Sequence, residues 1–387
     1  MNTANTDQTG QSEALNCGAM GAPDKKCCCN SSSACQATRY PADSWIVGSV
    51  STPIGDVPVV STRLEMADRL GAWKARWGIG RMQYRVAPGF YAVGNPAPSS
   101  PVLVSANYKL SFDRLRSHLG GLDAWIMVVD TKGVNVWCSA GKGTFCTDEV
   151  VRRTEAVRLP EVVSARKLVL PQLSAAGVAA HEVRKRSGFH VVFGPVRADD
   201  LRAFLATGMQ ATPEMREVQF PVRERLAVIP VELVQAASKI VLVAACFFLL
   251  AGLGRDGYSA DRAMGPGRFS AALFLLVCLA SLTLTPLLLP WLPGRAFAVK
   301  GAWLGLGLLV TLTGYKWPLP GVFENWINVG AWCLIVPAVA SFAAINFTGA
   351  TTFTSVSGAR REVQVAVPIQ AAFAGLGLVL WFVGRFV

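Results

Sequence analysis

The sequence is poor in histidine and in charge, and its cysteines are not spaced as protein-bound metal clusters require. Only 3 of the 387 residues are histidine, and charged residues make up 16% of the chain. No C-x₂-C-x₂-C-x₃-C run and no paired C-x₂-C occurs. We therefore expect neither an iron–sulfur cluster nor a zinc ribbon, and we interpret the isolated histidines as surface or core residues.

The N-terminus also lacks the apolar run of a secretory signal peptide, and the first long apolar segment begins only near residue 230. We expect the preceding half of the chain to stay in the cytoplasm. Thiols remain reduced there, so the ten cysteines do not indicate a disulfide framework. The net charge is +12, but the basic residues are scattered, and no basic stripe with interleaved aromatics points to nucleic acid.

Composition divides the chain into three parts. Residues 1–40 are polar without apolar periodicity, and we predict a disordered tail that carries Cys17, Cys27, Cys28, Cys29 and Cys35. Residues 41–225 have an ordinary soluble composition and are predicted to form an α/β domain. Residues 226–387 are strongly apolar and are predicted to form a membrane domain.

Short apolar runs alternate with helical patterns in the soluble part. The predicted strands are 102–104, 124–129, 167–170 and 189–193, with 134–137 as a further extended piece. The predicted helices are 62–76, 111–119, 147–156, 178–186 and 198–206. This order predicts a Rossmann-like parallel sheet covered on both faces, with the ligand site at the carboxyl ends of its strands.

Five apolar segments follow, each near the ~20 residues that cross a bilayer: 233–254, 269–292, 296–317, 326–347 and 364–384. They predict a multi-pass protein of the cytoplasmic (inner) membrane. Charged residues such as Glu232, Lys239 and Lys300 lie near the ends of these segments. A transporter or receptor is one alternative, but it would show polar residues in mid-span or an internal repeat. We therefore expect an anchor or a platform for a homodimer.

The motif from Asn135 to Phe145, N-V-W-C-S-A-G-K-G-T-F, is the most informative stretch of the soluble part. It does not match a phosphate-binding P-loop, because Val136 stands at the first glycine position and Gly143 at the Ser/Thr position. The small residues after Cys138 would allow a flat ligand to approach the backbone closely. If a helix begins at Cys138, its N-terminus and Lys142 would favour the thiolate. The residues alone leave open a metal-ligating thiolate, a nucleophile and a buried structural cysteine.

This motif resembles the cap-helix signature N-[VI]-W-C-[AS]-A-G-K of the mercury-methylating corrinoid proteins, the HgcA family. The likeness covers about residues 60–225, and within this range it includes the stretches 105–109, 170–173, 177–183 and 194–197. The five apolar segments also match the architecture of that family. Cys146 is an additional thiol, and the triplet Cys27–Cys29 lies beyond the shared pattern.

The resemblance implies a cobalamin or related corrinoid, bound base-off, with Cys138 as the lower axial ligand of cobalt. Thiolate is a soft anionic donor, and axial ligands are a protein's main control over a macrocyclic metal. Such a donor would favour release of the methyl group as a carbanion equivalent, the polarity that the substrate Hg(II) requires. The implied function is a corrinoid-dependent methyltransferase that forms methylmercury. The alternative is a corrinoid methyl carrier of one-carbon and acetyl-CoA metabolism.

The resemblance also implies partners and further contacts. The reductant would be a ferredoxin-like iron–sulfur protein, HgcB, and the methyl group would come from a methyltetrahydrofolate-linked donor. The N-terminal cysteines would either capture Hg(II) or belong to a flexible tail without a metal role. The expected corrinoid contacts adjoin Cys138 or end strands on the same edge of the sheet: Asn135, Val136, Trp137, Ser139, Ala140, Gly141, Lys142, Asn107, Gln172, Leu173, Gly194, Pro195 and Val196. For the strand-end residues, a turn-forming role is an equal alternative.

Overall fold

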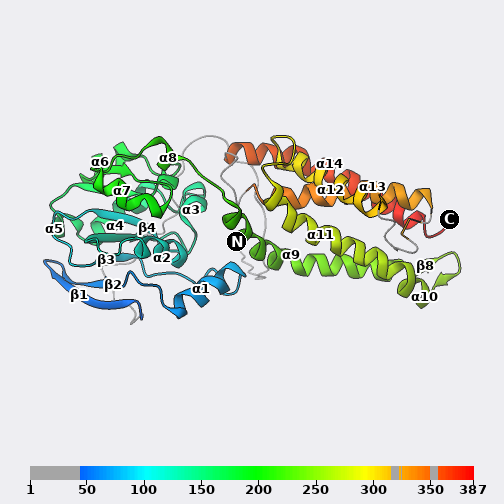
Figure 1. Cartoon of the computed structure of the whole chain (residues 1–387), viewed down its shortest axis with the longest axis horizontal. Helices are drawn as coiled ribbons and strands as arrows, with labels where there is room; N and C mark the ends of the chain where they lie inside the picture. The colour runs from blue at the N-terminus through cyan, green and yellow to red at the C-terminus, as the bar shows by residue number, and fades with distance from the viewer. Residues whose placement is uncertain (1–43, 315–321, 324, 349–355) are drawn as a thin grey trace, which may run out of the picture.

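The computed structural model describes residues 44–314, 322–323, 325–348 and 356–387, and it consists of two halves side by side (Figure 1). The predicted N-terminal tail with its five cysteines lies outside the described residues. The soluble half is built on a mixed sheet of seven strands. In chain order these strands are β1 (Ile46–Thr52), β2 (Gly55–Val60), β3 (Gly89–Val93), β4 (Val102–Ala106), β5 (Ala124–Val129), β6 (Lys167–Leu170) and β7 (His190–Phe193).

The strand order is β1-β2-β3-β5-β4-β6-β7. The neighbours β5, β4, β6 and β7 are all parallel, which confirms the α/β class and the four strands predicted from the sequence. The predicted parallel strands form one part of a mixed sheet, because β3 runs antiparallel to β5, and β1 and β2 form an antiparallel hairpin. These three strands escaped prediction because glycine and proline interrupt the region and β1 is largely exposed.

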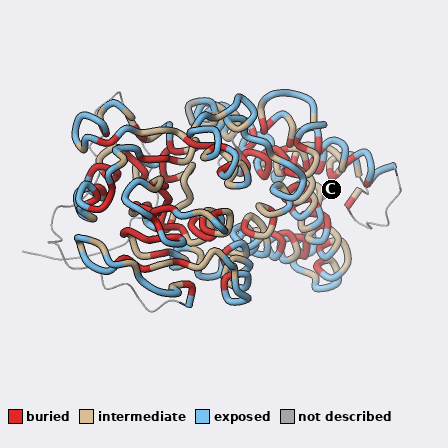
Figure 2. Tube along the Cα trace, turned by 60° about the vertical axis from the view of Figure 1, so that its left-hand side comes forward, coloured by how far each residue is buried: buried red, intermediate tan, exposed pale blue. Residues whose placement is uncertain are grey.

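Helices cover both faces of this sheet, as the continuous apolar runs predict. The helices after β4 are α2 (Lys109–Ser117), α3 (Val136–Lys142), α4 (Thr147–Ala156), α5 (Leu159–Val162), α6 (Ala180–Ser187), α7 (Leu201–Ala206) and α8 (Pro213–Arg216). Two 3₁₀ turns, η1 (Gln172–Ser174) and η2 (Ala198–Asp200), lie between them. Helix α1 (Met66–Arg76) precedes β3. Strand β5 contributes Trp125 and Met127 to one apolar cluster and Ile126 and Val128 to the other. Figure 2 shows buried segments in the interior of both halves of the molecule.

The second half holds five helices that are long and apolar enough to cross a membrane. They are α9 (Val222–Leu250), α11 (Arg268–Leu288), α12 (Phe297–Gly314), α13 (Trp326–Asn346) and α14 (Val356–Val383). Between α9 and α11 lie the short hairpin β8 (Leu253–Gly254) and β9 (Gly257–Tyr258), the turn α10 (Ala260–Arg262) and a π-helical turn η3 (Ala263–Gly267). The five predicted spans are therefore present as helices, although α9 begins about ten residues earlier than predicted.

Small residues bring the membrane helices together. A Cβ atom on Gly301 of α12 would lie 2.5 Å from the carbonyl oxygen of Ala340 on α13, and one on Gly305 would lie 2.6 Å from Cα of Pro337. Backbones that approach this closely make many van der Waals contacts. Such contacts drive helix association within a lipid bilayer, where no hydrophobic effect brings helices together.

Polar side chains also occur within the membrane helices, although the sequence predicts only charged residues near the ends of these segments. Gln370 of α14 is 6% exposed, and its Nε2 donates to Oγ of Ser341 at 2.6 Å. Ser341 in turn donates to the carbonyl oxygen of Ala298 at 2.8 Å. These bonds link α14, α13 and α12, a common use of polar residues between membrane helices.

Candidate functional site

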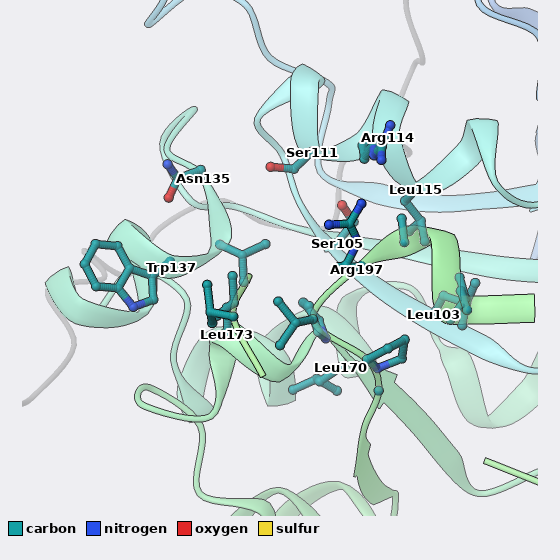
Figure 3. Close-up of a pocket in the computed structure, with 18 of the residues that line it drawn as sticks. Leu103, Ser105, Ser111, Arg114, Leu115, Asn135, Trp137, Leu170, Leu173 and Arg197 are labelled. Atoms are coloured by element: carbon teal, nitrogen blue, oxygen red, sulfur yellow. The ribbon is translucent and has the colours of Figure 1, made fainter. Parts of the chain in front are cut away.

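A cavity of about 420 Å³ lies beside the carboxyl ends of β6 and β7, between α2 and the start of α3. In Figure 3, Asn135 and Trp137 lie on one side of the cavity, and Leu103 and Leu115 lie on the other. The walls are mainly apolar, while the polar lining groups come from several elements. These polar groups are Ser105, Ser111, Arg114, Asn135, Arg197, Gln219 and Glu224.

The motif from Asn135 to Phe145 contains helix α3, and the start of this helix forms one wall of the cavity. Asn135 is its N-cap, and its side-chain oxygen accepts a hydrogen bond from the backbone N–H of Cys138 at 2.8 Å. Gly143 ends the helix with φ = +78°, a conformation that glycine adopts without strain. The prediction of an extended segment over 134–137 was wrong, because Asn135 caps a helix that begins at the β-branched Val136.

The residues of α3 face in different directions. Val136 and Trp137 line the cavity, whereas Ser139 and Ala140 are buried against the rest of the domain. Ser139 donates its hydroxyl hydrogen to the carbonyl oxygen of Val136 at 2.9 Å, so this side chain serves the helix itself. Cys138 is a free, half-buried thiol that does not itself line the cavity.

The surroundings of Cys138 differ from the expectation that a helix begins at this residue. Cys138 is the third residue of α3, and its N–H is already bonded to the Asn135 cap, so this amide is not free to bind a ligand. Lys142 follows four residues later and is exposed, which places both side chains on one side of the helix. Neither Gly141 nor Lys142 lines the cavity.

The strand-end residues divide into two groups. Leu173, Gly194, Pro195 and Val196 all line the cavity. Gln172 does not, but its side-chain oxygen is buried and finds no hydrogen-bond partner among the residues that the structure describes. The cavity therefore brings together residues from β6, from α3 and from the segment after β7, which lie up to about sixty positions apart in the sequence.

Asn107 belongs to the second group, because its side chain is occupied by the loop that leads to α3. Its Oδ1 accepts hydrogen bonds from the N–H groups of Thr131 at 3.1 Å and Gly133 at 2.9 Å. Its Nδ2 donates to Asp130 at 3.1 Å. Burial alone would raise the pKa of Asp130, but hydrogen bonds from Lys132 lower that pKa below its ordinary value. Asn107 thus positions the loop before Asn135 rather than lining the cavity.

Gly177 holds η1 against α3. A Cβ atom at this position would lie 2.3 Å from the carbonyl oxygen of Phe145 and 3.0 Å from Cα of Ala140. Both contacts are with backbone atoms, which cannot move aside as a flexible side chain could. The glycine therefore fixes the position of α3 relative to the end of β6.

Two arginines at the rim of the cavity were not predicted as site residues. Arg114 of α2 and Arg197 after β7 both contact the carboxylate of Asp199, at 3.0 Å and 2.9 Å. The hydrogen bond from Arg197 is the main reason that the pKa of Asp199 lies below its ordinary value. Arg197 ends the stretch 194–197 that carries part of the family resemblance, but no local signal pairs it with Arg114, 83 positions earlier.

The segment before the first membrane helix closes another side of the cavity. Val218, Gln219 and Phe220 line the cavity together with Glu224 of α9. Arg225 donates to the carbonyl oxygen of Phe220 at 2.8 Å and to that of Leu287 on α11 at 3.2 Å. The domain boundary predicted at residues 225 and 226 therefore falls within a segment that joins the cavity to the membrane half.

Comparison with known proteins relates the same region to acetyl-CoA metabolism. Residues 79–205 match the family described as CO dehydrogenase/acetyl-CoA synthase delta subunit. The chain is 31% identical over 127 residues to subunit gamma of the acetyl-CoA decarbonylase/synthase complex of Archaeoglobus fulgidus. It is 32% identical over 127 residues to the subunit of the same name from Methanopyrus kandleri.

These similarities cover only part of each protein. Each alignment spans 32% of this chain and 27% of the relative, so the chain covers about a quarter of the length of these relatives. The matched family region contains β3 to β7 and α3, and it lies wholly within the soluble half. This part of the soluble half is thus similar to subunits of the acetyl-CoA decarbonylase/synthase complex.

Proposed function

We propose that this chain is a membrane-bound corrinoid protein that carries methyl groups in one-carbon metabolism of the acetyl-CoA type. One observation supports the proposal above the others: the region similar to acetyl-CoA pathway subunits, residues 79–205, supplies most of the cavity lining. The names of the relatives concern acetyl-CoA metabolism, which favours this alternative over mercury methylation as the main function.

The lining of the cavity is chemically compatible with part of such a cofactor. Its volume of about 420 Å³ lies within the ~300–1,000 Å³ typical of ligand pockets. Apolar residues such as Leu103, Leu173 and Trp137 would contact the face of a macrocycle. Ser111 and Arg114 would meet polar groups on its periphery.

When bound, the corrinoid would supply a cobalt centre able to carry a methyl group. We propose Cys138 as the axial ligand on the protein side, because it lies on α3 next to two residues that line the cavity. Asn135 would position Cys138 by capping the helix, and Gly177 would hold α3 against η1. Val136, Trp137, Leu173, Gly194, Pro195 and Val196 would form the contact surface.

An absorption spectrum of the full-length protein in detergent with added cobalamin tests this proposal. We expect the wild type to bind cobalamin base-off with a sulfur-ligated spectrum, and Cys138→Ala to bind it without the sulfur signature. Cys146→Ala is the matched control, because Cys146 is a nearby buried thiol at the start of α4. Absence of cobalamin binding by the wild type would refute the function, whereas identical spectra of the wild type and Cys138→Ala would refute only the role of Cys138.

Mercury methylation is the second candidate, and the observation that favours it is the thiol of Cys138 beside the cavity within the motif of residues 135–145. Here the acceptor would be Hg(II), the reductant a ferredoxin-like iron–sulfur protein, and the methyl source a methyltetrahydrofolate-linked donor. Methylmercury formed by membranes that contain the wild type, lost in Cys138→Ala and largely kept in Cys146→Ala, would support it. A cobalamin-loaded protein that forms no methylmercury would leave methyl carriage as the function.

A further inference from the structure

Helix α1 exposes an apolar stripe to the surroundings of the protein. Met66, Leu70 and Trp73 are 67%, 53% and 56% exposed, and Trp77 is half-buried at a ring distance of 5.9 Å from Trp73. At 3.6 residues per turn, these four positions fall within an arc of about 60° on the helix. A stripe of this kind normally packs on a core, yet here it faces outward.

Basic residues flank this stripe on both sides. Arg69 and Arg76 lie about 70–90° to one side of it and Lys74 about 70° to the other, by the same helical geometry. All three are exposed. The only carboxylate between Met66 and Arg85 is that of Asp68, which is buried. An apolar centre with cations along its edges is the pattern of helices that lie in a membrane interface.

The opposite face of α1 is held firmly on the soluble half by charged groups. Asp68 is 6% exposed, and its carboxylate contacts Lys109 at 2.6 Å and Arg116 at 2.7 Å. On the same side, a Cβ atom on Gly71 would lie 2.6 Å from the ring of Tyr84. The outward direction of the apolar stripe is therefore fixed by buried ion pairs and close packing.

The apolar surface continues toward the membrane half. Ile79 and Met82, which follow α1, are 59% and 53% exposed. A Cβ atom on Gly78 would lie 3.6 Å from Cγ1 of Val234, and Arg81 interacts electrostatically with Glu232, both residues of α9. Figure 1 shows α1 beside the first part of α9.

The loop between α11 and α12 marks the same boundary of the membrane. Trp291 is 71% exposed, and the guanidinium of Arg225 lies 5.9 Å from the centre of its ring. Exposed tryptophans paired with basic residues are typical of the level of the lipid headgroups. The surface around α1 is thus continuous with a boundary that the membrane helices themselves define.

We propose that the segment 66–82 is an interfacial element that binds the headgroup region of an acidic phospholipid bilayer. Trp73 and Leu70 enter the interface, while Arg69, Lys74 and Arg76 contact lipid phosphates. The charge of the segment and its continuity with α9 favour lipid over a second copy of the chain or residues 1–43 as the occupant. This contact fixes the orientation of the soluble half on the membrane.

Photo-crosslinking of the full-length protein in nanodiscs tests the proposal. Benzoylphenylalanine replaces Leu70 in one variant and Val47 in the other, because Val47 is a similarly exposed apolar residue (64%) on the distant strand β1. In discs of phosphatidylcholine with phosphatidylglycerol, mass spectrometry should detect at least about fivefold more lipid adduct at position 70 than at position 47. Equal melting temperatures of the two variants establish that both remain folded.

A second comparison tests the role of charge. The combined variant R69Q, K74Q and R76Q, with the crosslinker at position 70, should lose several-fold of its lipid adduct in acidic discs and little in pure phosphatidylcholine. Crosslinks from position 70 to residues 1–43 or to a second copy of the chain would overturn the proposal. So would equal lipid adducts at positions 70 and 47, and an unchanged yield in the charge variant would overturn the preference for acidic lipid.

Discussion

The two halves of the molecule pack their interiors by opposite means. In the soluble half, bulky side chains fill the space between helices and sheet, as in the stacked rings of Phe90 and Trp125, 4.9 Å apart. In the membrane half, the absence of a side chain at Gly301 and Gly305 allows α12 to meet α13 backbone to backbone. The hydrophobic effect drives packing in the soluble half, because burial removes apolar side chains from water. In the membrane half, lipid is as apolar as the helices, so helix association depends on close van der Waals contact.

Charge is also distributed differently in the two halves. The soluble half buries a cluster in which Arg116 is fully buried and contacts Asp68 and Asp113. The membrane half has a cavity of about 490 Å³ whose walls are mostly apolar and include the charged residues Glu232 and Lys239. In the soluble half, buried charges are satisfied by opposite charges. In the membrane half, close packing and hydrogen bonds such as that from Gln370 to Ser341 hold the helices together.

The largest effect is expected from Arg116→Ala. This change removes one of two basic partners of the buried carboxylates of Asp68 and Asp113 and leaves them with Lys109. Breaking a buried ion pair in this way costs about 3–5 kcal/mol. Chemical denaturation followed by the fluorescence of the soluble half measures the loss. Arg114→Ala on the same helix is the control, because Arg114 is 59% exposed and exposed ion pairs contribute only about 0–1 kcal/mol. Equal losses in the two variants would refute the importance of the buried cluster.

A smaller effect is expected in the membrane half from Gly301→Val. The added side chain meets the backbone of α13, and overpacking of this kind costs about 1–3 kcal/mol. Gly307→Val is the control, because a Cβ atom at Gly307 has no neighbour within 4 Å and both changes place valine in the same helix. Melting temperatures of the full chain in detergent should fall only for Gly301→Val. A similar fall in both variants would indicate helix propensity rather than packing.

The smallest effect concerns pH. Burial alone would raise the pKa of Asp68, but hydrogen bonds and charge from Lys109 and Arg116 bring it below its ordinary value of 3.8. The folded state then binds fewer protons than the unfolded state. The stabilisation by this carboxylate is complete above pH 3.8 and is lost as the pH falls through the lower folded pKa. Denaturation between about pH 5 and 2 should show this loss in the soluble half, and a smaller loss in Asp68→Asn.

Local patterns predicted much of this architecture. Alternation of apolar runs with helical segments predicted β4 to β7, because both faces of these strands are buried and their sequences are continuously apolar. Length and composition predicted the five membrane helices. The motif around Cys138 lies at one wall of the cavity, because Asn135 to Trp137 line it, and the role of Cys138 itself stays a prediction.

Other features depended on neighbours that lie far away in the sequence. Asn107 ends a strand as expected, but hydrogen bonds from Thr131 and Gly133 direct its side chain into a loop instead of the cavity. Arg114 and Arg197 meet only because α2 and the end of β7 flank the same carboxylate. Phe220 lies five residues before the predicted domain boundary, and folding places it on the wall of the cavity.

The sequence by itself thus determined the four parallel strands, most of the helices around them and the five long apolar helices, because the spacing of apolar residues along a short stretch distinguishes a strand from a helix. Only the tertiary structure decided which face of α3 meets the cavity and that the apolar stripe of α1 points outward. The outward direction follows from the ion pairs of Asp68 with Lys109 and Arg116, residues more than 40 positions away, and no local pattern records such partners.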